Sequence, residues 1–385
     1  MAAGVSCGIK AKGLDLALVV SDRQATAAGV FTTNLAVAAP VVVSREHLDS
    51  SGGQARAIVV NSGCANACTG PGGLEAARLM AAETARAVGC DIEEVLVAST
   101  GVIGVALDRL KVTSGVIDAY GTLGRDGHTA ASLAIMTTDP FPKEAAVEAH
   151  LAGGVVRIGG MAKGSGMIEP NMATMLALLT TDAALAPGLL GRALAAAVED
   201  TFNAITVDGE CSTNDSVFLL ANGASGVTVG DDEFDVFVDA LREVCLALAL
   251  GIVRGGEGAT KLVTVVVTGA ASYADARRAA RAIANSLLVK TAVHGGDPNW
   301  GRLVAVAGRS GVAFTLERAR VRIGDVVLFE GGRPFDERAA RAAAVLASTD
   351  VELGVDLGTG GRHEATMWTC DLSADYVRIN ADYRT

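Results

Sequence analysis

The sequence has 385 residues, of which 50% are hydrophobic and 19% charged, so it can bury a large core and is long enough for two domains. Its formal net charge of −11 argues against binding of nucleic-acid phosphates, which requires clustered Lys and Arg. The longest apolar run, residues 244–253, is about half of the ~20 residues that a membrane span needs, and the first residues lack the pattern of a signal peptide. The seven cysteines have no zinc-site spacing and predict reduced thiols. We therefore expect a cytoplasmic protein without metal, membrane or nucleic-acid partners.

In the first half of the chain, short apolar segments alternate with turn residues and one helical pattern. Apolar residues recur at helical spacing over 74–88, and Gly89 is placed to end that helix. Residues 62–73 and 136–143 have the polar, Gly- or Pro-containing composition of loops. Strands are predicted at 16–21, 29–34, 40–44, 55–61, 94–100 and 155–159.

The second half continues the mixture of helices and strands. Helices are predicted at 188–202, 234–253 and 275–289, and polar runs at 206–215 and 294–302 predict loops. Strands are predicted at 261–268, 303–307, 321–323, 326–329, 351–357 and 365–369. The last 15 residues carry two tyrosines and predict a docked tail. Together these patterns predict an α/β or α+β protein.

A glycine-rich stretch in the middle of the chain is the most unusual local feature. Glycines at 159, 160, 164 and 166 predict a loop, and an apolar run begins at Met172. A loop that meets a buried segment suits a strained peptide bond, and we place that bond between Ala173 and Thr174. Residues 99–104 predict a second loop, at the end of a strand, where Thr100 and Gly101 can offer a hydroxyl and a backbone N–H to a developing negative charge. An ordinary turn remains the alternative there.

Several common catalytic motifs are absent from the sequence. It has no phosphate-binding P-loop, no complete dinucleotide-binding fingerprint, no Gly-x-Ser-x-Gly elbow and no paired metal-binding histidines. With only five scattered histidines, a general base near neutral pH has to come from another group. An α-amino group titrates at about 7.7–8.0. Cleavage before Thr174 would give that residue both a nucleophilic hydroxyl and its own base.

Eight strings in chain order resemble the ornithine acetyltransferase (glutamate N-acetyltransferase) family of arginine biosynthesis. They extend from the first strands to the last residue, so the resemblance covers nearly the whole chain. The strings are residues 61–67, 99–104, 135–139, 161–167, 170–176, 211–215, 297–302 and 376–385.

The resemblance implies an α+β fold, a layered α/β/β/α-type sandwich with mixed sheets of the self-processing N-terminal-nucleophile type, with a smaller C-terminal domain. It also implies cleavage between Ala173 and Thr174 into an α chain, 1–173, and a β chain, 174–385. Thr174 would accept acetyl from N2-acetylornithine and pass it to glutamate in a ping-pong reaction. The family suggests an α2β2 assembly and no cofactor. The use of acetyl-CoA as a second acetyl donor is left open.

By the same resemblance, Thr100 and Gly101 form the oxyanion hole. The family's substrate contacts fall on Thr137, Lys163, Thr174, Glu257, Asn380 and Thr385. A lysine can pair with a substrate carboxylate, a glutamate can bind an amino group, and neutral Asn and Thr can orient the amino acid. Thr138 is an alternative to its neighbour Thr137. Two other functions remain open: a related self-cleaving aminopeptidase or amidohydrolase, and an unprocessed amino-acid-binding paralogue.

Overall fold

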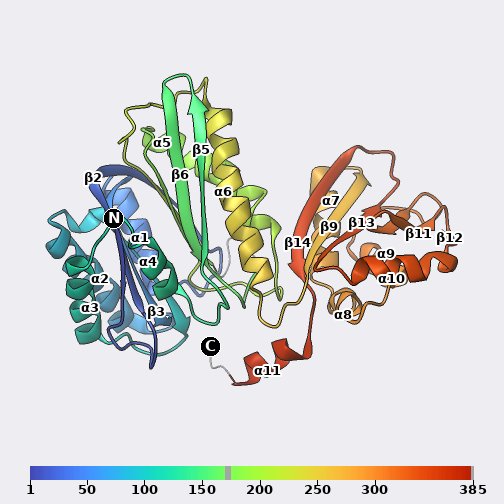
Figure 1. The fold of residues 1–385 in the computed structure, drawn as a ribbon, viewed down its shortest axis with the longest axis horizontal. Helices are drawn as coiled ribbons and strands as arrows, with labels where there is room; N and C mark the ends of the chain where they lie inside the picture. Colours follow the sequence, from blue (N-terminus) through green and yellow to red (C-terminus); the bar gives the residue numbers. More distant parts are fainter. Residues whose placement is uncertain (170–174, 383–385) are drawn as a thin grey trace. The chain divides into compact units, whose positions relative to one another are not determined.

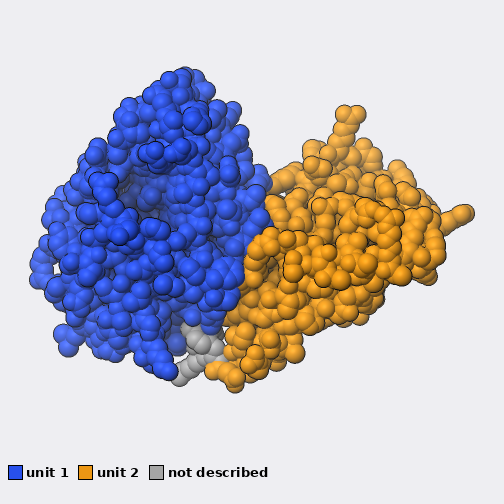
Figure 2. All heavy atoms as spheres, in the orientation of Figure 1, with its two compact units in different colours: residues 1–203, 210–252, 384–385 blue, residues 204–209, 253–383 orange. Residues whose placement is uncertain are grey.

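The computed structural model describes residues 1–169 and 175–382, which form two compact units (Figure 2). Unit 1 contains residues 1–169, 175–203 and 210–252, and unit 2 contains residues 204–209 and 253–382. The predicted cleavage site lies outside the described residues, within the stretch of sequence that belongs to unit 1. No helix of the described residues has both the length and the apolarity needed to cross a membrane.

Unit 1 is built on an eight-stranded mixed sheet. Its strand order is β4-β3-β2-β8-β7-β6-β5, and β1 pairs with β2. The strands are β1 (Ala2–Val5), β2 (Leu16–Phe31), β3 (Gln54–Cys64), β4 (Val95–Val102), β5 (Lys143–Leu151), β6 (Gly154–Lys163), β7 (Leu176–Thr181) and β8 (Ser216–Ala221). The helices are α1 (Ala39–Ser50), α2 (Gly70–Val88), α3 (Arg109–Gly121), α4 (His128–Ile135), α5 (Pro187–Glu199) and α6 (Phe234–Arg254), with short 3-10 turns at Ile92–Glu94 and Phe202–Ala204.

Both faces of the β2–β3–β4 part of the sheet are covered by helices (Figure 1). Successive residues of a strand point to opposite faces, so Val59 of β3 packs in the cluster that contains residues of α1, α2 and α3. Its neighbours Ile58 and Val60 pack on the other face, in the cluster that contains α4. Burial on both faces explains why β3 is almost continuously apolar.

Two features of this sheet position the predicted catalytic residues. Strands β3 and β4 are parallel, so their carboxyl ends meet at one edge, where Gly63 is paired with Gly101. Strand β7, which starts just after the predicted cleavage site, lies between β6 and β8. Thr100 and Gly101 therefore lie at the carboxyl end of β4, the last strand at one side of the sheet.

Unit 2 contains a six-stranded mixed sheet with the order β12-β11-β10-β13-β9-β14. Strands β9 and β13 are parallel, and the other pairs are antiparallel. The strands are β9 (Leu262–Ala270), β10 (Arg320–Ile323), β11 (Val326–Glu330), β12 (Arg333–Pro334), β13 (Asp350–Asp356) and β14 (His363–Cys370). The helices are α7 (Tyr273–Ala284), α8 (Leu287–Gly295), α9 (Trp300–Arg309), α10 (Ala339–Leu346) and α11 (Ala374–Asp382), with a 3-10 turn at Asp336–Arg338.

The predicted α+β class, with mixed sheets and a smaller C-terminal unit, is confirmed. All seven cysteines are free thiols, as predicted. The helix predicted over 74–88 is α2, and Gly89 ends it in the left-handed conformation at φ 74°, with its N–H bonded to the Ala85 carbonyl.

The strand predicted at 40–44 is wrong, because these residues begin helix α1. Pro40 lies in the first turn of this helix, where its missing N–H costs nothing. Ser44 and His47 are three residues apart and therefore share one face of the helix. Their side chains bond the Val97 and Val95 carbonyls of β4 at 2.7 Å each. Contact with the sheet thus outweighs the β preference of the Val run.

The strand predicted at 303–307 is also wrong, because it lies in helix α9. Asn299 caps this helix by accepting the Arg302 N–H at 3.1 Å, and Leu303, Val306 and Ala307 form its buried stripe. The single helix predicted over 275–289 is two helices, because Ser286 caps a new one, α8. The loop predicted from Gly159 begins later, since Gly159 and Gly160 lie within strand β6.

Candidate active site

Lys163, the last residue of β6, is the centre of a buried polar cluster in unit 1. Lys163 is only 4% exposed. Its ammonium donates to the Thr100 hydroxyl at 3.1 Å and to the Thr137 hydroxyl at 3.0 Å. Three of the residues predicted from the sequence are therefore in direct contact. Thr138 instead contacts the Ser165 hydroxyl, at 2.6 Å. Between the two adjacent threonines, Thr137 is the one beside Lys163.

Gly101 adjoins this cluster at the end of β4, in a position that only glycine fits. Its φ is +130°, and a Cβ there would lie 2.3 Å from the Gly63 carbonyl carbon. The neighbouring backbone is fixed by Asn214, whose side-chain amide donates to the Ser99 carbonyl at 2.8 Å and to the Ala65 carbonyl at 2.6 Å. Close packing of β3 on β4 thus fixes the Thr100–Gly101 peptide.

Asp139 holds the loop that carries Thr137. Its carboxylate accepts from the Lys143 ammonium at 2.6 Å, from the Gly164 N–H at 2.7 Å and from the Thr137 N–H at 3.1 Å. Burial by itself would raise the pKa of Asp139, but the positive charges of Lys163 and Lys143 outweigh it and lower that pKa to about 2. Burial lowers the pKa of Lys143, and Asp139 opposes that shift. Asp139 therefore ties both sides of the cluster together as a carboxylate.

Asp215 is a second buried carboxyl, placed just before β8. Its Oδ1 accepts the N–H of Met175 at 2.5 Å, and its Oδ2 has no hydrogen-bond partner among the described residues. Burial raises the pKa of Asp215 well above its ordinary value. The amide that it binds is the one that joins Met175 to Thr174.

Glu257 and Asn380 lie together in unit 2. Glu257 is 7% exposed, and its Oε2 accepts from the Asn380 side-chain amide at 2.7 Å. The loop that carries Glu257 is fixed to the start of α11, because Ser373 donates to the Gly258 carbonyl at 2.6 Å. Gly258 has φ +69°, and a Cβ there would lie 2.5 Å from the Tyr376 nitrogen.

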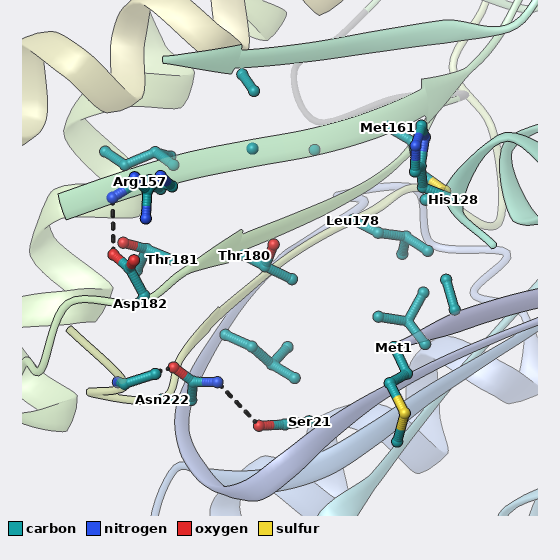
Figure 3. A pocket seen from close by; sticks show the side chains of 18 of the residues that line it. Met1, Ser21, His128, Arg157, Met161, Leu178, Thr180, Thr181, Asp182 and Asn222 are labelled. Carbon is teal, nitrogen blue, oxygen red and sulfur yellow. Dashed lines mark hydrogen bonds between the residues drawn. The ribbon is translucent and has the colours of Figure 1, made fainter. Parts of the chain in front are cut away.

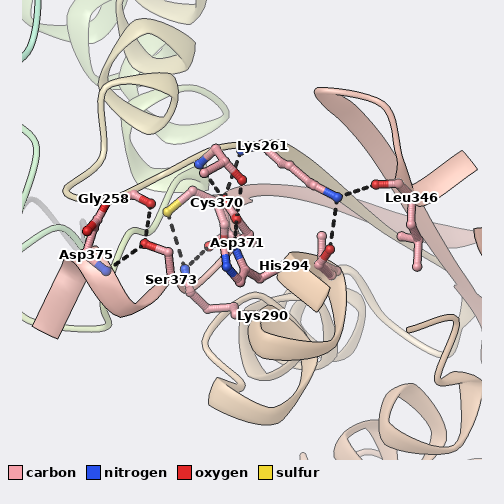
Figure 4. Close-up of polar contacts among 12 residues, drawn as sticks. Gly258, Lys261, Lys290, His294, Leu346, Cys370, Asp371, Ser373 and Asp375 are labelled. Atoms are coloured by element: carbon pink, nitrogen blue, oxygen red, sulfur yellow. Dashed lines mark hydrogen bonds and ion pairs between the residues drawn. The ribbon is translucent and has the colours of Figure 1, made fainter. Parts of the chain in front are cut away.

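A buried carboxylate, Asp371, anchors the same loop from the other side (Figure 4). It accepts from the Thr260 N–H at 2.7 Å, from the Thr260 hydroxyl at 2.6 Å and from the Lys261 N–H at 2.9 Å. Burial opposes ionisation, but these bonds and the one from His294 lower the pKa of Asp371. The loop between α6 and β9 is therefore rigidly held.

The profile described as the ArgJ family matches residues 1–385. The chain belongs to the ArgJ family. The predicted resemblance, and with it the prediction that the chain is an enzyme of this family, is confirmed.

Two curated ArgJ relatives cover the whole chain, and both are named arginine biosynthesis bifunctional protein ArgJ. The protein of Chlorobaculum tepidum is 50% identical over 384 residues, which cover 100% of this chain and 95% of the relative. The protein of Symbiobacterium thermophilum is 49% identical over 393 aligned residues, covering 100% of this chain and 96% of the relative. A solved chain of the Bacillus halodurans ArgJ protein is 42% identical with a TM-score of 0.51, and the match covers 53% of this chain and 97% of that one.

Three residues predicted for the ArgJ site lie outside the described residues: Ala173, Thr174 and Thr385. The predicted roles of these and of the other site residues stay predictions. The six predicted site residues that the structure describes form two groups, one in each unit. Thr100, Gly101, Thr137 and Lys163 belong to unit 1, and Glu257 and Asn380 belong to unit 2.

A cavity of about 940 Å³ in unit 1 contains none of the predicted site residues (Figure 3). Residues of β5, β6 and β7 line one side of it, among them Met161, Leu178 and Thr180. Its lining lacks the Thr100–Lys163 cluster, so we do not assign it to the ArgJ reaction.

The sequence alone predicted no individual role for Asp139 or Asp215. Asp139 follows Thr137 and Thr138 in one of the family strings, and Asp215 ends another. The available signal for both residues was their place at the end of a polar family string that also contains or adjoins predicted site residues. Their contacts, however, depend on distant residues. Asp139 accepts from Gly164, 25 positions away, and Asp215 accepts from Met175, 40 positions away.

Proposed function

We propose that the chain is a self-processed acetyltransferase that moves acetyl from N2-acetylornithine to glutamate, giving ornithine and N-acetylglutamate. Membership of the ArgJ family and the names of its full-length relatives, which refer to arginine biosynthesis, support this function. The word bifunctional in those names supports a second acetyl donor for the acetylation of glutamate, for which we propose acetyl-CoA.

The contact between Lys163 and Thr100 is the observation that carries the proposal. The Thr100 oxygen accepts a hydrogen bond from the Lys163 ammonium at 3.1 Å, so its own hydrogen is left to donate elsewhere. A buried positive charge beside a hydroxyl makes that hydroxyl a stronger donor. Together with the Gly101 N–H, it suits the oxyanion that forms when an acetyl group is attacked.

In the proposed reaction, the Thr174 hydroxyl attacks the acetyl carbon of N2-acetylornithine, and its proton passes to the Thr174 α-amine. The tetrahedral oxyanion accepts hydrogen bonds from Thr100 and Gly101. Its collapse breaks the amide bond, the α-amine returns the proton to the leaving nitrogen, and ornithine departs. Glutamate then attacks the acetyl ester, and the same steps in reverse release N-acetylglutamate and free Thr174.

Cleavage between Ala173 and Thr174 supplies the α-amine in this scheme. The solved Bacillus halodurans chain is matched over 97% of its length by 53% of this chain, and a solved chain of about half this length supports cleavage. The proposed β chain, residues 174–385, is of similar size.

The residues of unit 2 have roles in the proposed function that follow from their chemistry. The Glu257 carboxylate would bind the side-chain ammonium of ornithine, and Asn380 holds that carboxylate at 2.7 Å. Thr385 is proposed as a neutral contact. An α2β2 assembly in the cytoplasm remains part of the proposal, and light scattering of the processed protein tests the assembly.

A denaturing gel and a transfer assay test the proposal. The purified protein should give two bands, of residues 1–173 and 174–385, with Thr at the new N-terminus, and Thr174→Ala should give one full-length band. Acetyl transfer from N2-acetylornithine to glutamate should require the two-band form. A single band from active protein would refute the mechanism, hydrolysis without transfer would favour the aminopeptidase or amidohydrolase alternative, and binding without turnover would favour the paralogue.

A further inference from the structure

Lys10 lies in the turn between β1 and β2, and a buried aspartate fixes this turn. Asp15 is fully buried, and its two oxygens accept the N–H groups of Cys7 at 2.7 Å and of Lys10 at 2.9 Å. The backbone of Lys10 therefore has a defined position in unit 1.

The side chain of Lys10 reaches the polar cluster around Lys163. It passes over Gly63, since a Cβ added to Gly63 would lie 2.6 Å from the Lys10 Cγ. Gly63 is the residue of β3 that pairs with Gly101. Its ammonium donates to the Met136 carbonyl at 3.0 Å, which is the peptide just before Thr137. Lys10 and Lys163 thus bind adjacent residues of the same loop.

Neither ammonium has an ion pair among the described residues. The two carboxylates that act on Lys10 are already engaged, Asp15 with backbone N–H groups and Asp139 with Lys143. Burial is the main cause that lowers the pKa of Lys10; Asp15 opposes this shift and Lys163 adds to it. Two neighbouring ammonium groups, Lys163 buried and Lys10 half-buried, whose nearby carboxylates are hydrogen-bonded to other groups, favour binding of an anion.

The hydrogen bonds of Lys163 explain why a second cation is needed. An ammonium has three N–H groups, and Lys163 gives two of them to Thr100 and Thr137. It has one left for a substrate carboxylate, which has two oxygens. In both proposed substrates the α-carboxylate is attached to the carbon that bears the reacting nitrogen. It must therefore bind close to the oxyanion residues, where Lys163 lies.

We propose that Lys10 is a second substrate-binding cation, which holds the α-carboxylate of the amino acid together with Lys163. This inference rests on the proposed acetyl transfer and adds a residue to its binding site. It assigns recognition of the free carboxylate to two lysines that are distant in the sequence.

The experiment compares Lys10→Gln with Lys12→Gln, a matched control at an exposed position of the same turn. Glutamine keeps an N–H that can bond the Met136 carbonyl but removes the charge. We expect Lys10→Gln to raise KM for N2-acetylornithine and for glutamate by about 10-fold or more, the usual effect of losing a charge-assisted hydrogen bond, with little change in kcat. Lys10→Arg should keep most of the affinity, and Lys12→Gln should match the wild type.

A substrate analogue separates carboxylate binding from a purely structural role. Isoglutamine is glutamate with its α-carboxylate replaced by a carboxamide, so Lys10→Gln should leave kcat/KM for isoglutamine unchanged. An equal loss with glutamate and isoglutamine would overturn the proposal, because Lys10 would then act only through the loop. An unchanged KM for glutamate would overturn it as well.

The outcome is distinct from failure of the proposed function. Wild-type protein without acetyl transfer would refute the function itself, whatever the variants do. Two bands of Lys10→Gln on a denaturing gel would show that it folds and processes itself. If Lys10→Gln stays uncleaved, Lys10→Arg is used for the test instead. The proposal fails if the Arg variant is cleaved but its KM for glutamate is well above that of the wild type.

Discussion

Asp139→Asn removes the charge of the carboxylate that links Thr137, Gly164 and Lys143 in unit 1. Asp139 has a side chain with 0% exposure, and its pKa falls from 3.8 to about 2 in the folded protein. That difference corresponds to about 2 kcal/mol of folding free energy at pH 7. We expect Asp139→Asn to lose at least this amount, because the buried Lys143 ammonium also loses its partner.

The pH dependence of the loss has a definite sign. Because the folded-state pKa lies below the ordinary value, the ionised carboxylate stabilises the protein fully above a pH of about 4. This stabilisation disappears as the pH falls through about 2. The loss of stability in the variant should therefore be about 1 kcal/mol smaller at pH 3 than at pH 7.

Hydrogen exchange resolves where the loss occurs. Peptides that contain the Thr137 and Gly164 amides should exchange faster in Asp139→Asn, since both amides donate to Asp139. Urea unfolding followed by far-UV circular dichroism gives the free energy. Both tryptophans, Trp300 and Trp368, belong to unit 2, so their fluorescence is the internal control. A loss that is equal at pH 7 and pH 3, or below about 0.5 kcal/mol, would refute the assignment of Asp139 as an ionised linker.

Three further substitutions test other parts of the site. Gly101→Ala should lower kcat about 100-fold or more through the displaced oxyanion peptide. Gly121→Ala, whose Cβ would meet no atom within 4 Å and whose φ is not positive, should retain most activity in the same steady-state assay. Burial raises the pKa of Asp215, so the wild type should lose stability as the pH rises from the ordinary pKa of the carboxyl to its raised folded-state pKa. Asp215→Asn stays neutral and should lack this loss; an equal change in urea stability between pH 4 and pH 8 for both proteins would contradict this. Glu257→Gln should raise KM for N2-acetylornithine about 10-fold but not for glutamate, since only ornithine carries a side-chain ammonium; equal effects on both substrates would remove Glu257 from ornithine recognition.

Local sequence patterns correctly predicted the elements in which the apolar pattern matches the faces that are buried. Helix α2 has both the apolar period and its Gly89 cap, and β3 has the apolar run of a strand that is buried on both faces. Helices α1 and α9 were missed because their Val-rich segments favour strands by composition. Contacts with the sheet, such as that of Ser44 with Val97, decide the outcome.

The sequence named candidate site residues but could not predict the contacts between them. The resemblance supplied Lys163, Thr100 and Thr137, but the bonds between them join positions that are 63 and 26 residues apart. No periodic pattern encodes such contacts. Asp139 was missed for the same reason, because its importance comes from Lys143 and Gly164 together.

The position of β7 and β8 has a consequence for how the processed protein refolds. Cleavage before Thr174 would place both strands on one chain, while their outer neighbours, β6 and β2, belong to the other. The cut would leave a sheet in which each chain completes the other's hydrogen-bonding edges. Recovery from denaturant would then be a second-order encounter, with a yield that rises with protein concentration. The uncleaved Thr174→Ala chain would refold in a first-order reaction, so only the processed protein would have a stability that depends on protein concentration.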